Sequence, residues 1–362
     1  MLYYCKISSR KNITSVRKKP HLPFRGKTVV FGGDFRQTLP VVCRQGRAGI
    51  ISKTIQRCSF WSSVQVLHLT INERVRQSGE NEQSQRFADF LLQLGEGRLP
   101  YNTALGKHTV RIPDEYVCNN QNLQDFVRWC YPDIDSSSIN VTGKAILAPK
   151  NKHVDELNNI ALSLMQGNAE NFESADSVKT TGDDRESVNF PTEYLNTINA
   201  SGLPPHKLTI KIGSPLILLR NINPKQGLCN GTRLVLKQIF KRVLKVEIMN
   251  GSHAGKEAWI PRIDHLTAEN FLPFSMNRRQ FPVKLAFAMT INKSQGQTLK
   301  HTGLWLPEPV FAHGQLYVAL SRSGDPANTK ILMHDVKGKQ GRFMGIEEWY
   351  TRNVVYQEVL QD

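Results

Sequence analysis

Two stretches in the last third of the chain combine residue types that suit the binding of phosphate groups. In the first, the apolar residues 281–291 lead directly into a polar run: Asn292, Lys293, Ser294, Gln295, Gly296 and Gln297. Ammonium, hydroxyl and amide groups donate hydrogen bonds to phosphate oxygens, and glycine lets a phosphate approach the backbone closely. In the second stretch, apolar residues at helical spacing separate Gln315 from Arg322. The two stretches together indicate a ligand-binding site more than a packing role.

A strand and a helix are predicted to position these groups. Residues 281–291 are mainly apolar and β-branched, which is typical of a strand buried in a sheet. The second stretch predicts a helix with Gln315 in its first turn and Arg322 at its end. Because ligands of open α/β sheets bind at the carboxyl ends of the strands, we expect the polar run to lie at a binding site.

Two more apolar runs turn polar in the first quarter of the chain. Residues 28–31 predict a short buried strand, followed by a polar loop that contains Asp34 and ends at Gln37. Residues 64–69 predict another strand, and the polar residues after it include Arg74. The chain therefore presents polar groups at the ends of several predicted strands.

The remaining sequence predicts an α/β chain with a β-rich insertion. Helices are expected at residues 50–58, 86–94, 123–130 and 154–165, and a further strand at 145–147. Residues 167–189 are rich in Asp, Glu, Ser and Asn and predict a mobile loop. Short β runs separated by Gly and Asn occupy residues 208–263 and predict a small β-barrel or sheet.

The charge of the chain makes a polyanion its natural partner. There are 47 Lys and Arg residues against 31 Asp and Glu, which gives a net charge of +16. We expect residues 1–22 to form an unstructured basic lead. Its arginine- and serine-rich, acid-free composition is weakly like a nuclear or a mitochondrial address, and a lead with no address is the alternative.

The sequence disfavours several classes of protein. The six cysteines form no CxxC pair and the ten histidines no HExxH motif, which argues against a zinc site, a disulfide framework and a metallohydrolase. No stretch approaches the roughly 18 apolar residues of a membrane span. The length allows about two domains, and the compartment is predicted to be reducing.

Six motifs resemble those of one enzyme family. AFAMTINKSQGQTL (286–299) and GQLYVALSRS (314–323) resemble the fifth and sixth signature motifs of the Pif-type DNA helicases, in particular the helicase part of Helitron transposon proteins, which are 5′-to-3′ enzymes of superfamily one. The resemblance extends to GGDFRQTLPVV (32–42), LTINERVR (69–76), AILAPKN (145–151) and GLCNGTRL (227–234). A family member also has a phosphate loop of the GxxxxGK[ST] type (Walker A) and an acidic Mg²⁺-binding pair (Walker B), and neither occurs in this sequence.

The resemblance implies an α/β fold and a partner. Residues 23–138 would form part of a first RecA-like domain with a linker, and residues 139–362 a complete second RecA-like domain of the P-loop NTPase type. A small inserted β-barrel would span about 208–265. ATP and Mg²⁺ are the cofactors that the family implies, although the residues that would hold Mg²⁺ are absent. Single-stranded DNA or duplex junctions are the implied partners, in recombination, repair or transposition.

Three residues match family positions that act on the γ-phosphate. Arg322 and Arg74 resemble its two arginines, and an arginine finger contributes roughly 10³–10⁵ in rate because phosphoryl transfer depends on charge stabilisation. Gln37 resembles the glutamine that senses the γ-phosphate and links it to DNA. A surface salt bridge is the alternative for each arginine, and a turn position for Gln37. Asp34 would brace its loop or, as the alternative, act on a metal ion.

Other positions resemble contacts to nucleotide and DNA. Near the nucleotide the resemblance places Gly296 and Gln315. For the DNA backbone it places Thr290, Lys293, Ser294 and Gln295. Phe35 beside Arg36 could stack a base within a basic groove, as could Phe281 beside Arg278 and Arg279. Trp305 and Tyr317 are two further candidates for such stacking. Core packing is favoured for Tyr317 and Phe287, and His313 is predicted to be a polar residue at a helix start.

Two functions remain open from the sequence. One is the C-terminal portion of an ATP-dependent 5′-to-3′ DNA helicase that cannot hydrolyse ATP alone. The other is a non-catalytic remnant of a transposon helicase that binds single-stranded nucleic acid. An in-frame phosphate loop and an Asp-Glu pair encoded just upstream would favour the helicase.

Overall fold

The computed structural model describes residues 6–7, 23–42, 45–73, 76, 82–102, 105–106, 108–136, 139–178, 190–199, 202–267, 272, 274–342 and 347–361. The chain divides into two compact units. Unit 1 comprises residues 1–118, 294–300 and 304–362, and unit 2 comprises residues 119–293 and 301–303. The RecA-like domains were predicted from the positions of the motifs, whereas these two units are compact groups of residues in the structure. The predicted domain boundaries therefore stay a prediction.

Unit 1 is organised around a long and a short helix, α3 (Glu82–Glu96) and α7 (Gln315–Leu320), which pack against each other. α3 confirms the amphipathic helix predicted at 86–94 and extends it at both ends, and it buries Phe87 and Leu94. A small antiparallel sheet with the order β18-β19-β3 completes the unit: β18 (Gly341–Arg342), β19 (Trp349–Arg352) and β3 (Thr109–Ile112).

The first described residues of unit 1 form short elements. β2 (Val29–Val30) pairs antiparallel with β1 (Lys6–Ile7), so this part of the expected lead is paired, while the rest of residues 1–22 lies outside the described residues. The helix predicted at 50–58 is wrong: α1 (Arg47–Ile51) ends early and a 3-10 turn follows at Ile55–Arg57.

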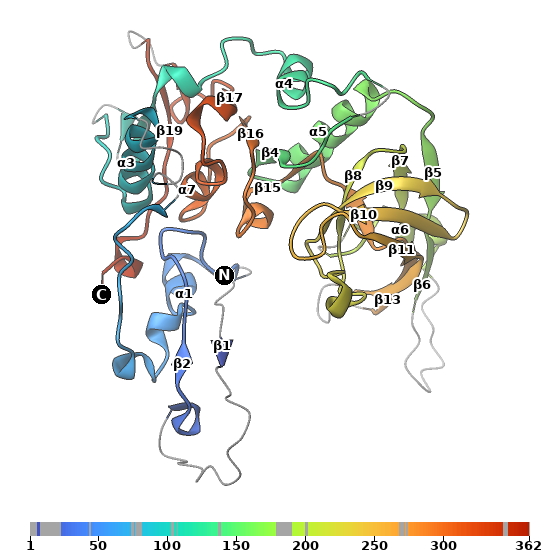
Figure 1. Cartoon of the computed structure of the whole chain (residues 1–362), viewed down its shortest axis with the longest axis horizontal. Helices are drawn as coiled ribbons and strands as arrows, with labels where there is room; N and C mark the ends of the chain where they lie inside the picture. The colour runs from blue at the N-terminus through green and yellow to red at the C-terminus, as the bar shows by residue number, and fades with distance from the viewer. Residues whose placement is uncertain are drawn as a thin grey trace. The chain divides into compact units, whose positions relative to one another are not determined.

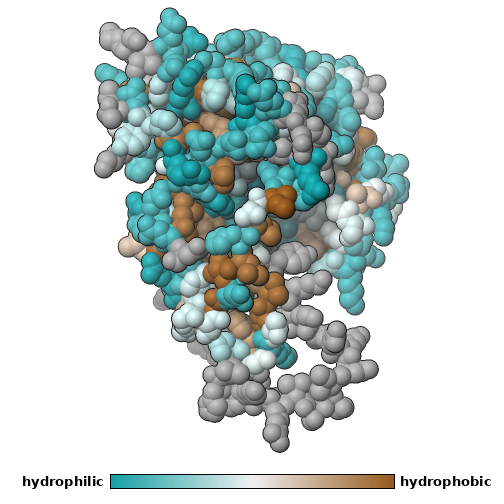
Figure 2. All heavy atoms as spheres, turned by 60° about the vertical axis from the view of Figure 1, so that its left-hand side comes forward, coloured by the Kyte–Doolittle hydropathy of each residue, from teal (hydrophilic) through white to brown (hydrophobic). Residues whose placement is uncertain are grey.

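The strand predicted at residues 64–69 is also absent. These residues follow a 3-10 turn (Trp61–Ser63) and belong to no strand. The side chains of Leu67 and Leu69 are 80% and 99% exposed, and hydrophobic side chains are visible on the face that Figure 2 displays. A strand needs a neighbouring backbone to complete its hydrogen bonds, and no strand within the described ranges pairs with this segment.

Unit 2 contains the parallel strand pair that carries the first polar run. β4 (Lys144–Ala148) pairs in parallel with β15 (Ala288–Thr290). α5 (Asn151–Leu164) packs along β4 and β15 (Figure 1). Residues 145–148 are completely buried, as expected for a strand covered on both faces.

The predicted strand at 281–291 is interrupted, and its two halves belong to different sheets. β14 (Val283–Leu285) pairs antiparallel with β8 (Pro215–Leu218), and after Ala286 and Phe287 the chain continues as β15. One apolar run therefore joins the α/β part of unit 2 to its β-rich part. Uniform apolarity gives no signal for such a change of partner.

The β-rich insertion consists of strands in antiparallel sheets. The largest has the order β11-β10-β9-β8-β14, with β9 (Arg233–Ile239), β10 (Val243–Ile248) and β11 (Glu257–Pro261). Its strands fall within residues 208–263, where short β runs were predicted, apart from β14, which belongs to the predicted strand at 281–291. β10 alternates buried and half-buried residues, the pattern of a strand that buries one face.

A second group of strands includes residues that were predicted to be loop. β6 (Ala175–Val178) pairs with β13 (Met276–Gln280), which also pairs with β12 (Ile263–Leu266), and β5 (Glu170–Glu173) pairs with β7 (Lys207–Ile210). The mobile loop predicted at 167–189 is therefore wrong for residues 170–178, because distant partner strands order polar residues there. Residues 179–189 lie outside the described residues.

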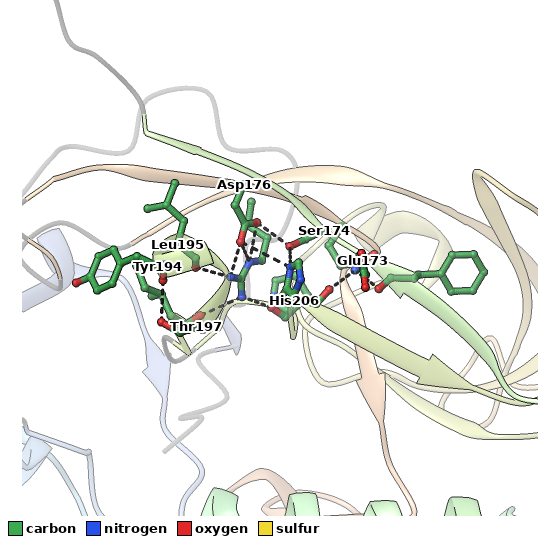
Figure 3. A network of polar contacts seen from close by, with 12 residues as sticks. Glu173, Ser174, Asp176, Tyr194, Leu195, Thr197 and His206 are labelled. Carbon is green, nitrogen blue, oxygen red and sulfur yellow. Dashed lines mark hydrogen bonds and ion pairs between the residues drawn. The ribbon is translucent and has the colours of Figure 1, made fainter. Parts of the chain in front are cut away.

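A buried ion pair holds this second group together. The Arg278 guanidinium contacts the Asp176 carboxylate at 2.6 Å, and both side chains are 0% exposed. Its remaining N–H groups donate to the carbonyl oxygens of Leu195, Ile198 and Pro204. Figure 3 shows Asp176 beside Ser174 and His206, with Leu195 supplied by α6 (Thr192–Thr197). Arg278 is thus committed to structure, which corrects its prediction as a DNA-contacting residue.

Among the described residues, no helix combines the length and the apolarity needed to cross a membrane.

Candidate functional site

The polar loop after β2 is organised by Asp34. Its carboxylate accepts the backbone N–H of Arg36 at 3.0 Å and the side-chain amide of Gln37 at 3.3 Å. It also accepts the hydroxyl of Tyr317 from α7 at 3.0 Å. Three hydrogen bonds to one carboxylate fix the loop and orient Gln37. The structure thus places Asp34 as a brace, and Tyr317 contacts it in addition to packing.

Arg36 is held by a carboxylate from α3. Its Nε and Nη2 atoms donate to Glu96 Oε1 at 3.1 and 2.6 Å. Although burial alone would lower the pKa of Arg36, Glu96 and Asp34 raise it, and Arg36 in turn helps to hold the pKa of Glu96 below its usual range. Beside it, the Phe35 ring packs edge-on against Trp61 with centroids 6.1 Å apart. Both predicted DNA-contacting side chains are therefore engaged within unit 1.

The residue before α7, Gly314, packs closely against the loop that contains Asp34. Gly314 has a φ of 69°, and a Cβ atom there would lie 2.3 Å from the carbonyl oxygen of Arg36. Gln315 follows, buried in the first turn, and its side-chain oxygen accepts the backbone N–H groups of Phe311 and Ala312. Gln315 thus holds the backbone of the residues that precede α7. Only glycine fits the position before it.

His313 joins the loop to the end of the chain. Its Nδ1 accepts the backbone N–H of Tyr356 at 2.8 Å, so its Nε2–H donates to the carbonyl oxygen of Phe35 at 2.7 Å. The imidazole is 2% exposed and neutral in this tautomer. Burial lowers the pKa of His313, against the opposing effect of the Phe35 carbonyl. The prediction of a plain helix-start residue missed this bridging role.

We expect acid to destabilise unit 1 through His313. Its pKa is lower in the folded than in the unfolded chain, so its contribution is present above the ordinary histidine value near 6.5 and is lost as the pH falls below it. Urea unfolding of the protein between about pH 7.5 and 5 should show this loss, which His313→Gln should reduce. The exposed-residue control His68→Asn should retain it. An identical acid response in all three proteins would remove His313 as its cause.

The polar run after β15 contacts the same loop. A 3-10 turn (Ile291–Ser294) is followed by Gln295, whose side-chain oxygen accepts the hydroxyl of Thr38 at 3.1 Å. Gly296 has a φ of 79°, and no atom lies within 4 Å of the position that a Cβ would take, so the backbone there is open to a ligand. Ser294 is completely buried, which turns its side chain away from solvent in this arrangement.

Arg322 ties the polar run to α7. The side chain is 5% exposed, and its guanidinium donates to the carbonyl oxygens of Val318, Ser294 and Gln297. It is therefore not a surface arginine. Its charge lies among the residues of two predicted motifs, but its N–H groups are directed at backbone oxygens. Action on a phosphate would require the side chain to turn.

The predicted DNA-contacting residues of unit 2 are Thr290, the last residue of β15, and Lys293 in the 3-10 turn after it. Asn158 of α5 fixes the backbone at the start of this strand. Its Oδ1 accepts the N–H of Ala288, and its Nδ2 donates to the carbonyls of Ala288 and of Leu285, the last residue of β14. The strand then delivers Thr290, which is half-buried, and Lys293, whose side chain reaches solvent. Sequence reasoning missed Asn158, whose only signal is a polar residue on the apolar face of a predicted helix.

Lys293 has an environment that favours loss of its charge. Although part of the side chain reaches solvent, neighbouring protein atoms desolvate the ammonium group, and this desolvation and the nearby Lys284 lower the pKa of Lys293 to about 8, while Asp155 acts in the opposite direction. An anion placed beside the ammonium group would restore the charged form. Lys293 is thus suited to a ligand that carries a negative charge.

Arg74 lies outside the described residues. No group of three or more His, Cys, Asp or Glu side chains in the described part of the chain is arranged to hold a metal ion. Since Arg322 and Gln315 are also hydrogen-bonded to backbone, the residues described do not form a cradle for ATP and Mg²⁺ in this arrangement.

Comparisons with known proteins agree with the motifs. Residues 5–104 match the model of the family described as PIF1-like helicase, and residues 193–239 match the model of the 2B domain of DNA helicase Pif1. This chain is similar to the Pif1-like helicases over these two segments. The resemblance noted from the sequence is confirmed at the level of the family.

Curated relatives extend the similarity over most of the chain. The ATP-dependent DNA helicase PIF1 of Xenopus laevis is 24% identical over 87% of the chain, and Pif1 of Campylobacter jejuni is 26% identical over 85%. PIF1 of Danio rerio is 33% identical over 41%. The chain spans 42%, 63% and 23% of these relatives, respectively.

Solved Pif1 structures share the fold. The crystal structure of Pif1 from Candida albicans has a TM-score of 0.57 at 22% identity and is matched over 94% of this chain and 69% of that chain. Bacteroides Pif1 bound to single-stranded DNA has a TM-score of 0.56 at 20% identity, matched over 87% and 64%. The chain thus has the mixed α/β fold of these helicases.

Proposed function

We propose that this chain forms the DNA-binding and nucleotide-coupling part of a Pif-type, ATP-dependent 5′-to-3′ DNA helicase. The observation that carries the proposal is a hydrogen-bonded cluster in unit 1. Thr38 of the motif at 32–42 bonds to Gln295 of the motif at 286–299, and Asp34 bonds to Tyr317 of the motif at 314–323. The second of these bonds spans 283 residues of sequence. Three motifs that are distant in the chain thus meet at one place.

Such a cluster suits a device that couples two ligands. A change in the motif at 32–42 alters its hydrogen bonds to the other two, because Thr38 contacts Gln295 and Asp34 contacts Tyr317 of α7. Gln37 remains our candidate for sensing the γ-phosphate, with Arg322 and Arg74 as the candidate arginines. A second RecA-like domain and a β-barrel around residues 208–265 are the architecture that we propose for this function.

We propose single-stranded DNA as the ligand of Thr290, Lys293 and Gln295. The net charge of +16 supports a polyanionic partner, and the open backbone at Gly296 allows a phosphate to approach. Binding of this kind has little sequence preference and a strong salt dependence, because neutralisation of phosphates supplies most of the affinity.

Lys293→Ala combined with Thr290→Ala is expected to weaken binding to a fluorescent 20-nucleotide single strand. Removing one charged phosphate partner should also reduce the slope of log K against log salt by about 0.7. Fluorescence anisotropy across a salt series measures both quantities. The matched control is Lys300→Ala, an exposed lysine close by. The paired substitution should also weaken binding more than removal of residues 1–22, and the reverse order would refute the proposed contact.

The alternative function, a non-catalytic module that binds single-stranded nucleic acid, shares this DNA contact. ATP turnover that single strands stimulate and that Arg322→Ala abolishes would favour the helicase. Retained DNA binding without turnover, in a protein that includes any sequence naturally preceding this chain, would favour the binding module.

A further inference from the structure

Two arginines of unit 2 lie close together outside the motif cluster. Arg262 lies directly before β12, and Arg279 lies on β13, the strand paired with β12. The Arg262 guanidinium lies over two aromatic rings, with its Cζ atom 5.6 Å from the centroid of Phe172 and 5.2 Å from that of Phe281. Its Nη2 donates to the carbonyl oxygen of Glu173 at 3.0 Å. The Arg262 side chain is therefore held in one orientation.

No carboxylate neutralises this pair within the described residues. Asp264 faces Arg279 in the strand register but forms no ion pair with it within 4.0 Å, and none of the ion pairs between described residues includes Arg262 or Arg279. Burial and the neighbouring Arg279 lower the pKa of Arg262. The contrast with Arg278 is direct, because that arginine lies on the same strand and is fully paired with Asp176.

Arg262 also has unused hydrogen-bonding capacity. Its Nε atom is buried and has no acceptor among the described residues. The Arg262 side chain as a whole is half-buried, so an acceptor from outside the protein can reach its guanidinium. Buried donors are normally satisfied, and a planar guanidinium held on aromatic rings is well suited to phosphate oxygens.

We propose that Arg262 and Arg279 form a phosphate-binding site for the sugar-phosphate backbone of a nucleic acid. The inference rests on the proposed DNA-binding function, and it adds a second contact point that none of the six motifs contains. Arg262 supplies the fixed guanidinium, and Arg279, which is exposed, supplies the second charge. The rings of Phe172 and Phe281 orient Arg262, and a phosphate between the two arginines relieves their repulsion.

The test compares Arg262→Gln/Arg279→Gln with Lys241→Gln/Arg242→Gln. The control pair removes the same charge from an exposed turn of the same unit. Binding to a fluorescent 20-nucleotide single strand and to a 20-base-pair duplex is measured across a salt series. Because the double variant removes two charged phosphate partners, the slope of log K for the single strand should fall by about 1.4, which corresponds to roughly 25-fold weaker binding at 0.1 M salt relative to a 1 M reference. A slope equal to that of the control pair on both ligands would overturn the site.

A second measurement separates this inference from the proposed function. Inorganic tripolyphosphate should raise the Tm of the wild-type protein, and the double variant should lose most of that shift. If the wild type binds neither oligonucleotide but keeps the shift, the proposed function fails and the phosphate site stands. An equal shift in wild type and double variant would overturn the site. Arg279→Gln alone, an exposed substitution, should fold normally and reduce the slope by about 0.7.

Discussion

Replacing Gly314 with alanine is expected to lower the free energy of unfolding of unit 1 by about 2–5 kcal/mol. The left-handed backbone at Gly314 costs an alanine roughly 1–2 kcal/mol, and overpacking typically adds about 1–3 kcal/mol. The added methyl carbon would lie 2.3 Å from the carbonyl oxygen of Arg36 and 2.7 Å from the carbonyl carbon of Gln37. Because these neighbours are backbone atoms, relief requires the loop that contains Asp34 to move away from α7.

The measurement is hydrogen exchange of the α7 amides, together with urea unfolding. Gly314→Ala should accelerate exchange in α7 and in the loop around residue 34. Gly324→Ala is the matched control, since no atom lies within 4 Å of the position of its Cβ and its φ is not positive. Equal stability and exchange in the two variants would mean that the loop and α7 are not closely packed.

Replacing Asp176 with alanine is expected to destabilise unit 2 by about 3–5 kcal/mol, the cost of leaving one member of a buried ion pair alone. Arg278 would keep the carbonyls of Leu195, Ile198 and Pro204 but lose its carboxylate partner, the only one within ion-pair distance of it in the described residues. Thermal and urea unfolding measure the loss. The strands β6 and β13 should become the least protected part of the β-rich region.

The double variant Asp176→Leu/Arg278→Met provides the comparison. It removes both charges, so it should recover a large part of the stability that Asp176→Ala loses, although three carbonyls then lack a donor. If the double variant is less stable than Asp176→Ala, the unpaired charge is not the source of the loss.

Local patterns in the sequence predicted much of this structure. The helix at 123–130 is found as α4 (Leu123–Cys130), because Asn122 caps it by accepting the N–H groups of Gln124 and Asp125 and its apolar residues fall on one face. The strand at 145–147 was recognisable because a parallel strand covered on both faces is uniformly apolar. These features depend only on residues close together in the chain.

The geometry of the candidate site could not be predicted in the same way. The bond between Asp34 and Tyr317 joins residues 283 positions apart, and no periodicity specifies such a partner. Arg322 has the type and place of a phosphate-contacting residue, yet burial directs it to backbone carbonyls. The sequence identified which motifs carry polar groups, whereas the hydrogen bonds between them depend on long-range packing.

The pH dependence of single-strand binding tests the central claim most directly. If Lys293 contacts a DNA phosphate, binding requires its charged form, whose pKa in the free protein is about 8. Affinity should therefore be nearly constant below about pH 7 and fall by up to about tenfold between pH 7 and 9. Lys293→Arg stays charged throughout, so the ratio of wild-type to variant affinity isolates this residue. The account predicts that the ratio falls by about tenfold, and a ratio that stays constant from pH 7 to 9 would contradict it.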